Sequence, residues 1–231
     1  MFKIAKRTSI GALLLMFFPL LFIVTRWHWT PENNYCWLKW MYFLTQTVTP
    51  PWGTITTLVF ISWFLWSLHY QIKSTFRLLL ILIIMLFIGQ GIKFFIKLYV
   101  KEPRPYVIWL EKNKVISKEA FYKMPRKICN SSVNWNFKEK KIPKWLVIYW
   151  KSETHFSFPS GHTIFSSNLV LLAAGLLWPR QYKVSTIALM SWANGVMFSR
   201  LMLGMHWPLD LLMSVILSWL IVTIGCWFIQ N

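Results

Sequence analysis

Six stretches of the chain are long and apolar enough to cross a lipid bilayer as helices. A spanning helix needs about 20 mostly apolar residues, so six of them occupy most of a 231-residue chain. The stretches are residues 8–25, 53–70, 77–98, 162–179, 184–203 and 208–229. We therefore expect an all-α integral membrane protein, a bundle of six transmembrane helices that forms a single domain over residues 1–231.

The composition agrees with this class and narrows the range of partners. Hydrophobic residues make up 56% of the chain and charged residues only 14%, against roughly 25% charged residues in soluble domains. Such a chain is too apolar to be disordered. Its net charge of +18 favours anionic lipids or anionic substrates. Nucleic acid is disfavoured as a partner, because the apolar stretches leave it little surface.

Two segments outside the apolar stretches have a distinct character. Residues 99–158 hold 13 Lys and Arg and several prolines, so we expect an extramembrane segment between the third and fourth helices. Residues 35–48 are rich in Trp and Tyr and are expected to lie at the membrane interface. The first apolar stretch follows basic residues, as in a signal peptide. It is long for one and no cleavage site follows, so we expect an uncleaved anchor.

The basic residues of the short connections predict the orientation. If six helices alternate, one side of the membrane receives Lys3, Lys6, Arg7, Lys73, Arg77, Arg180 and Lys183. The positive-inside rule makes that side cytoplasmic. The 13 basic residues of the 99–158 segment then lie outside, although long loops obey the rule less strictly. In either orientation, the ends of helices three and five meet the starts of helices four and six on one face.

Three motifs fall on that shared face. They are Lys97-x6-Arg104-Pro105, then Pro159-Ser160-Gly161-His162, and finally Ser199-Arg200-x5-His206-x3-Asp210. Segments far apart in the sequence thus bring three cations, two histidines and one carboxylate to one level of the membrane. This juxtaposition predicts the functional site.

Asp210 is the only aspartate of the chain and lies within an expected span. Ionisable residues inside a membrane are costly, which makes them functional candidates. Asp210 follows His206 by four residues, so both side chains share one helical face. Pro208 suits a first helical turn, so this helix should begin near Trp207. A helix cap or an ion pair with Arg200 is the alternative role for Asp210, but it leaves His206 unexplained.

The remaining motif residues predict an anion site. Ser160 is a favoured N-cap, and Gly161 allows a ligand to approach the backbone N–H groups of a helix start. Taken singly, this is a plain capped helix, and the three cations are interfacial side chains that reach toward water. Taken together, Lys97, Arg104 and Arg200 can surround a phosphate with charge-assisted hydrogen bonds.

These residues predict phosphate-ester hydrolysis. His206, backed by Asp210, would attack phosphorus, and His162 would protonate the leaving oxygen. No metal-ligand cluster is visible in the sequence, so we expect metal-independent hydrolysis without a cofactor. The alternative is a non-catalytic polytopic binder or transporter of anionic lipids. Such a protein has no need of a carboxylate one turn from a histidine.

Other residues carry weaker expectations. Glu153 is a loop carboxylate that is a candidate to orient a basic residue at the site entrance, and Lys93 lies one turn before Lys97 on the same face. The cysteines form no CxxC motif. Cys36 and Cys129 are expected on one side of the membrane, where they either pair or stay unpaired.

The eleven residues that the three motifs specify resemble the type 2 phosphatidic acid phosphatase family of lipid phosphatases. Nearly the whole chain is similar to bacterial members, including Trp63-Phe64-Leu65-Trp66. The resemblance implies a six-helix bundle in the bacterial inner membrane, with its site facing the periplasm and an extramembrane segment between helices three and four. One departure is that the sequence stops at Asn231, directly after the sixth expected helix, which should leave the site unaffected.

The resemblance also implies roles and substrates. His206 would be the nucleophile, Asp210 its stabiliser and His162 the proton donor. The implied substrates are phosphatidylglycerol phosphate, undecaprenyl diphosphate, phosphatidic acid, lysophosphatidic acid and diacylglycerol diphosphate, with no obligate protein partner. The residues that would bind the phosphate are Lys97, Arg104, Ser160, Gly161 and Arg200.

Overall fold

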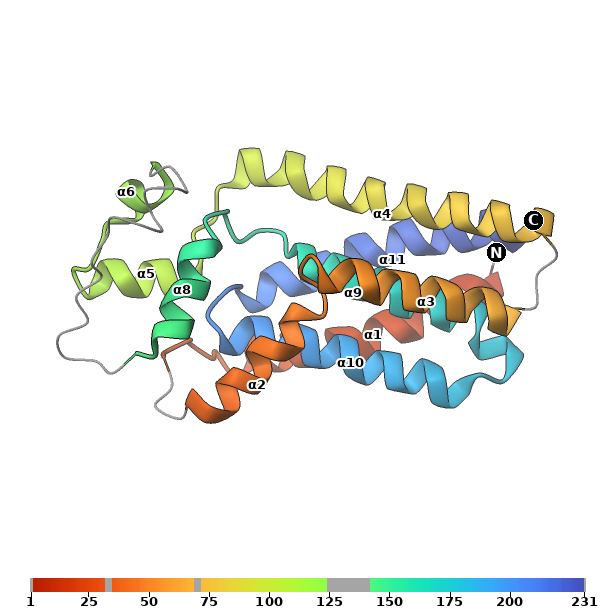
Figure 1. Ribbon diagram of the computed structural model, residues 1–231, viewed down its shortest axis with the longest axis horizontal. Helices are drawn as coiled ribbons and strands as arrows, with labels where there is room; N and C mark the ends of the chain where they lie inside the picture. Colours follow the sequence, from red (N-terminus) through yellow and green to blue (C-terminus); the bar gives the residue numbers. More distant parts are fainter. Residues whose placement is uncertain (1, 32–34, 69–71, 124–141, 231) are drawn as a thin grey trace.

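The computed structural model describes residues 2–31, 35–68, 72–123 and 142–230. Helices account for the regular structure of these ranges, which contain no strand. The long helices run side by side along the longest axis of the molecule (Figure 1). The expected all-α fold is confirmed for the described residues.

The helices follow one another along the chain with short connections. They are α1 (Phe2–Val24), α2 (Tyr35–Gln46), α3 (Trp52–Leu68), α4 (Ile72–Val100), α5 (Pro105–Lys112), α6 (Lys118–Lys123), α8 (Lys144–Ser152), α9 (Gly161–Leu176), η1 (Trp178–Arg180), α10 (Lys183–Met202) and α11 (Pro208–Gln230).

Each of the six apolar stretches forms a helix, namely α1, α3, α4, α9, α10 and α11. Within the described residues, three of them (α1, α4 and α11) are long and apolar enough to cross a membrane. The helices α3 and α9 are apolar but shorter. The structure thus supports a membrane protein built on at least these long helices, while the count of six spans stays a prediction.

Helix α9 forms the centre of the bundle. Thirteen of its 16 residues are buried, and it packs against α1, α4, α10 and α11. The outer faces of the surrounding helices instead expose large apolar side chains, such as Leu13, Phe87 and Ile224. In water such a surface would drive aggregation, whereas in a bilayer it faces lipid tails.

The described part of the 99–158 segment is largely helical and covers one end of the bundle, opposite the two chain termini (Figure 1). The ring of Tyr106 stacks on Trp150 with centroids 5.3 Å apart. The indole of Trp150 donates to the carbonyl of Leu203 over 3.1 Å. The sequence did not predict this helical structure. Cys129 lies outside the described residues, so the expected alternatives for Cys36 are untested.

A tight turn at Gly204 connects α10 to α11. Gly204 has φ +71°, and a Cβ there would lie 2.5 Å from the indole of Trp29. That indole donates to the carbonyl of Met202 over 2.9 Å. Because L side chains avoid positive φ and no room exists for one, the position requires glycine. The turn sets the place of His206 two residues later.

Candidate active site

His206 and Asp210 form a buried pair at the start of α11. The Nδ1 atom of His206 lies 3.2 Å from Oδ2 of Asp210, and each side chain is only 2% exposed. The same carboxylate oxygen accepts the N–H of Trp207 over 2.9 Å. Helix α11 begins at Pro208, as the sequence predicts. With Nδ1 directed at the carboxylate, Nε2 is on the opposite side of the ring.

Glu153 bridges the two arginines of the candidate site. Its Oε2 atom lies 3.0 Å from Nη2 of Arg104 and 3.9 Å from Nη2 of Arg200. Arg104 also donates from Nε to the carbonyl of His155 over 2.6 Å. The expectation that Glu153 orients a basic residue is therefore confirmed, and it contacts two of them.

Arg200 is fully buried near the end of α10 and retains unpaired donors. Its Nη1 atom donates to the hydroxyls of Thr45, over 3.2 Å, and Tyr149. Its Nε and Nη2 atoms have no hydrogen-bond acceptor within the described residues. Buried polar groups are almost always hydrogen-bonded in native proteins. Two open guanidinium donors therefore point to an anionic ligand.

Ser160 caps α9 and connects it to α11. Its Oγ atom accepts from the backbone N–H of Thr163, over 3.3 Å, and from the Thr163 hydroxyl, over 3.0 Å. The N–H of Ser160 donates to Oγ of Ser214 over 2.8 Å, and that hydroxyl donates to the carbonyl of Asp210 over 2.6 Å. These bonds fix the start of α9 beside the first turn of α11. The N–H of Ser160 is engaged here, although the sequence placed it among the free donors.

His162 lies in the first turn of α9 and meets the segment after α2. Its Nε2 atom is 3.0 Å from the Thr49 hydroxyl. Thr49 also donates to the carbonyl of Thr45, one turn earlier. Because Thr45 contacts Arg200, the end of α2 connects His162 to the arginine of α10.

The two lysines of α4 are held by local contacts. Lys97 donates from Nζ to the carbonyl oxygens of Phe156 and Ser157. Lys93 donates to the side chain of Gln90, and a Cβ on Gly161 would lie 2.8 Å from the side chain of Lys93. Lys97 thus anchors the loop before α9, and Lys93 covers Gly161.

The local charges bias two groups outside the apolar helices. Burial alone would raise the pKa of Glu153, but Arg104 and Arg200 outweigh it and hold the pKa at about 2. Burial lowers the pKa of His206 well below its usual value, and the positive charges of Arg104 and Arg200 lower it further. His206 is therefore neutral and Glu153 ionised at neutral pH.

The described residues contain no group of three or more His, Cys, Asp and Glu side chains placed to hold a metal ion. The charges that surround His206 come from arginine and lysine instead. Such fixed cations can stabilise the charge of a phosphoryl group.

Comparison with known proteins gives the family. The profile of the PAP2 superfamily matches residues 78–231, which contain all three motifs. The chain belongs to this family. It is 46% identical over 230 residues to phosphatidylglycerophosphatase B of Escherichia coli K12, covering 99% of this chain and 91% of that relative. Phosphatidylglycerophosphatase B of Haemophilus influenzae is 33% identical over 234 residues, with 98% and 96% covered. The matches confirm the resemblance and the expected enzyme class, a lipid phosphatase.

Sequence reasoning missed several residues of the site. Tyr149, Thr45 and Thr49 contact Arg200 or His162, and Ser214 connects α9 to α11. One signal was available, because Tyr149 and Glu153 are four residues apart, as are Thr45 and Thr49, and such pairs share a helical face.

Proposed function

We propose that this protein is an integral-membrane phosphatase that hydrolyses the phosphate monoester of phosphatidylglycerol phosphate through a phosphohistidine intermediate. The observation that carries the proposal is the pair of buried, unpartnered donors on Arg200, whose charge acts on the neutral His206. A phosphate oxygen satisfies such donors, and the adjacent imidazole supplies a nucleophile.

The first step transfers the phosphoryl group to His206. Asp210 holds Nδ1 of His206, so the lone pair of Nε2 attacks phosphorus. The P–N bond forms as the bond to the lipid oxygen breaks, and His162 gives a proton to that oxygen. Asp210 stabilises the imidazolium that develops, as the aspartate does in a serine-protease triad.

The second step returns the enzyme to its starting state. His162, now neutral, takes a proton from a water molecule that attacks phosphorus from the side left by the lipid alcohol. The P–N bond breaks, its electron pair returns to Nε2, and inorganic phosphate departs. Both steps place negative charge on the same phosphoryl oxygens, so one set of donors serves both.

Ser160 has a defined role in this scheme. A hydroxyl carries two lone pairs and one proton, and both lone pairs of Ser160 already accept from Thr163. Its proton is thus the part left to bind a phosphate oxygen. Gly161 keeps the adjacent backbone accessible. Arg104, Arg200 and Lys97 supply the positive charge.

Glu153 occupies the position that an anion takes between Arg104 and Arg200. In the structure its carboxylate compensates part of their charge. A substrate phosphate, with more charge and more acceptor oxygens, competes for the same guanidinium groups. We therefore place the phosphate on the side of Arg200 where Nε and Nη2 lack acceptors.

The choice of substrate follows the relatives, which are named as phosphatidylglycerophosphatases. The family resemblance adds undecaprenyl diphosphate, phosphatidic acid, lysophosphatidic acid and diacylglycerol diphosphate. All of these share a terminal phosphate on a lipid, and the scheme above applies to each. A parallel assay of phosphatidylglycerol phosphate and undecaprenyl diphosphate ranks the two chemical classes.

We further propose that the protein lies in the bacterial inner membrane, with six spans and the site toward the periplasm. The basic connections support this orientation, because α1, α4 and η1 begin at the end that carries the termini (Figure 1). The candidate site is at the opposite end. No protein partner and no metal ion enters the scheme.

Trapping the intermediate tests the mechanism and the function together. Detergent-solubilised full-length protein is mixed with lipid that carries a radiolabelled terminal phosphate and quenched without acid. We expect release of labelled phosphate and acid-labile label on His206. Replacing His206 by alanine should abolish both, whereas His28→Ala, at an exposed histidine far along the sequence from the motifs, should change neither.

Two outcomes would contradict the proposal. Label found on His162, or retained in folded His206→Ala protein, would reverse or refute the assigned roles. A folded protein that releases no phosphate from any lipid phosphate would leave the alternative function, a binder or transporter of anionic lipids.

A further inference from the structure

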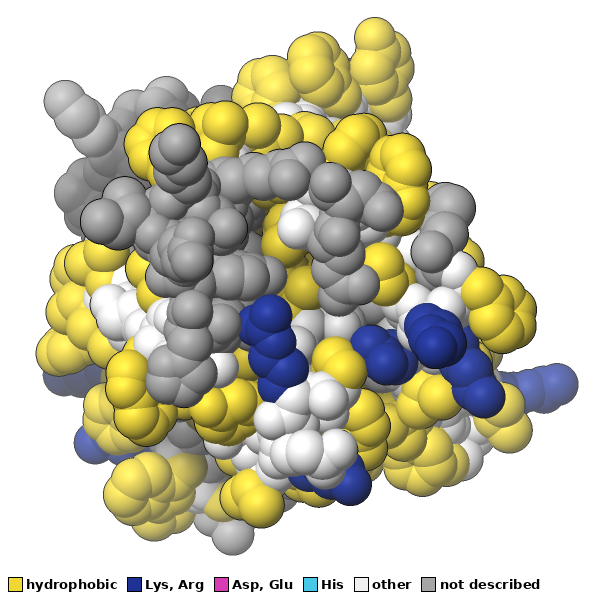
Figure 2. All heavy atoms as spheres, turned by 90° about the vertical axis from the view of Figure 1, so that its right-hand side faces the viewer, with side chains coloured by type: hydrophobic (Ala, Val, Ile, Leu, Met, Phe, Trp, Pro, Cys, Tyr) yellow, Lys and Arg dark blue, Asp and Glu magenta, His cyan; other side chains and the backbone are white. Residues whose placement is uncertain are grey.

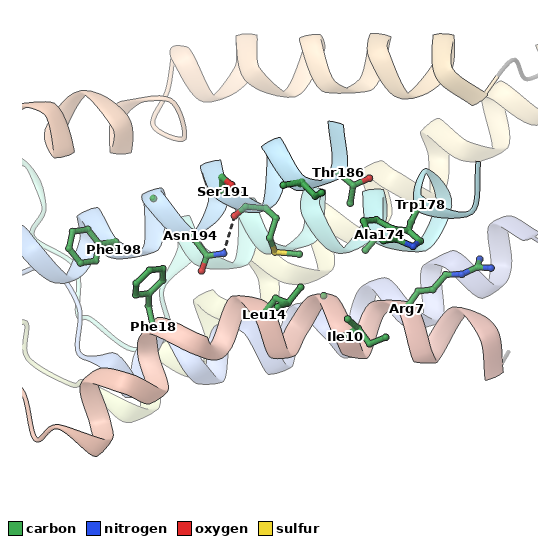
Figure 3. A pocket seen from close by; sticks show the side chains of 14 residues that line it. Arg7, Ile10, Leu14, Phe18, Ala174, Trp178, Thr186, Ser191, Asn194 and Phe198 are labelled. Carbon is green, nitrogen blue, oxygen red and sulfur yellow. Dashed lines mark hydrogen bonds between the residues drawn. The ribbon is translucent and has the colours of Figure 1, made fainter. Parts of the chain in front are cut away.

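A groove opens on the outside of the bundle between α1 and α10, with α9 behind it (Figure 3). Its volume is about 810 Å³. Apolar side chains of α1 and α10 form most of the lining, including Ile10, Leu14, Phe18, Ile187, Met190 and Phe198. Several of these are exposed in the described chain, so the groove opens toward the lipid-facing side.

The groove has one apolar end and one basic end. Phe18 and Phe198 close it on one side, with ring centroids 5.9 Å apart. Arg7 and Trp178 lie at the other end (Figure 3). Within the described residues the Arg7 guanidinium has no ion pair or hydrogen bond. Trp178 is of the type that favours the headgroup level of a membrane.

The basic end belongs to a face of one charge sign. Lys3, Lys6, Arg180 and Lys183 are exposed around it. In the sequence, none of the seven Asp and Glu falls within residues 1–25, 72–78 or 178–187. Figure 2 shows this end of the molecule with Lys and Arg and no acidic side chain among the residues coloured there. An anion that meets Arg7 therefore finds no repelling carboxylate.

The length of the groove matches one leaflet. Phe18 follows Arg7 by eleven residues of α1, which at 1.5 Å per residue is roughly 16 Å. Half of a hydrocarbon core is about 15 Å. A transmembrane helix of a partner would continue past Phe18 and Phe198, whereas an acyl chain with its headgroup at Arg7 ends there.

We propose that this groove binds one anionic phospholipid of the leaflet next to the chain termini. The lipid phosphate pairs with Arg7, and one acyl chain lies between α1 and α10 as far as Phe18 and Phe198. The site is at the opposite end of the bundle from His206 and does not depend on the proposed function.

Native mass spectrometry of the detergent-solubilised full-length protein tests the site. The probes are dioleoyl phosphatidylserine and dioleoyl phosphatidylcholine, which have the same tails and differ in net charge. Arg7→Gln removes the phosphate partner, and Lys183→Gln is its control, since it removes one charge from the same end outside the groove lining. Ser191→Trp fills the groove, and Val184→Trp adds the same bulk to an exposed position of α10 that does not line it.

We expect Arg7→Gln to weaken phosphatidylserine binding about fivefold, which corresponds to about 1 kcal/mol per basic residue near a membrane surface, with little effect on phosphatidylcholine. Ser191→Trp should reduce binding of both lipids. The two controls should bind like the parent. Equal effects of Arg7→Gln and Lys183→Gln, or unchanged binding by Ser191→Trp in folded protein, would overturn the proposal. Enzyme activity plays no part in either result.

Discussion

Replacing Arg200 by lysine tests whether the open guanidinium donors act in catalysis. Lysine keeps the charge but offers one ammonium in place of the planar fork. In the structure Nη1 is held by Thr45 and Tyr149, while Nε and Nη2 have no acceptor in the described part of the chain. A lysine ammonium that takes the place of Nη1 therefore leaves the two catalytic donors missing.

The expected loss follows from the number of donors. Removal of one donor to a charge that develops in the transition state costs about 2.7–4 kcal/mol, or roughly a hundredfold to a thousandfold in kcat. Two donors are lost but the charge is retained, so we expect a fall of at least about a hundredfold in kcat. Because the donors act on transition-state charge, kcat and kcat/KM should fall together.

The assay is phosphate release from phosphatidylglycerol phosphate by detergent-solubilised enzyme over a range of substrate concentrations. Arg180→Lys is the matched control, because it makes the same chemical change at an exposed position near the opposite end of the bundle. Thermal unfolding confirms that both variants are folded. An Arg200→Lys enzyme within about threefold of the parent kcat would refute the role of Nε and Nη2 as phosphate donors.

Two further predictions concern the metal and the pH dependence. Excess EDTA should leave phosphate release unchanged, since arginine and lysine supply the positive charge; loss of turnover that a divalent ion restores would contradict this. Glu153, whose folded pKa of about 2 lies below the usual 4.5, stabilises the fold above pH 4.5 and loses this contribution as the pH falls toward 2. The difference corresponds to about 3 kcal/mol as an upper bound. The thermal stabilities of parent and Glu153→Gln should thus converge as the pH is lowered from 6 to 3, and parallel curves would exclude the ion pairs as their cause.

The parts of the site that the sequence predicted are those set by short-range geometry. The spacing of His206 and Asp210 gives a shared helical face wherever the helix packs, and Pro208 suits the first turn in any context. Ser160 likewise caps α9 by a bond within its own turn. The apolar stretches predicted the long helices for the same reason, because length and hydropathy are local properties.

The parts that the sequence did not predict depend on which segments meet. Tyr149 contacts Arg200 only because α8 packs over the end of α10, where Trp150 donates to Leu203. The carbonyl oxygens that hold Lys97 belong to a loop 59 residues later. No local pattern specifies such pairings, and the mixed composition of residues 99–158 gives no helical periodicity that would have placed α8.

The two ends of the molecule divide its charge according to function. At the site end, Glu153 lies between Arg104 and Arg200, so the cations are compensated in part and their geometry is fixed before a substrate arrives. At the terminal end, Lys3, Lys6, Arg7 and Lys183 have no carboxylate nearby in the sequence, and Arg7 is open to a ligand. Preorganised, partly neutralised cations suit a phosphate that must bind, react and leave. Uncompensated cations at a membrane surface suit lipids that stay. The same residue types thus serve turnover at one end and, by our proposal, retention of a lipid at the other.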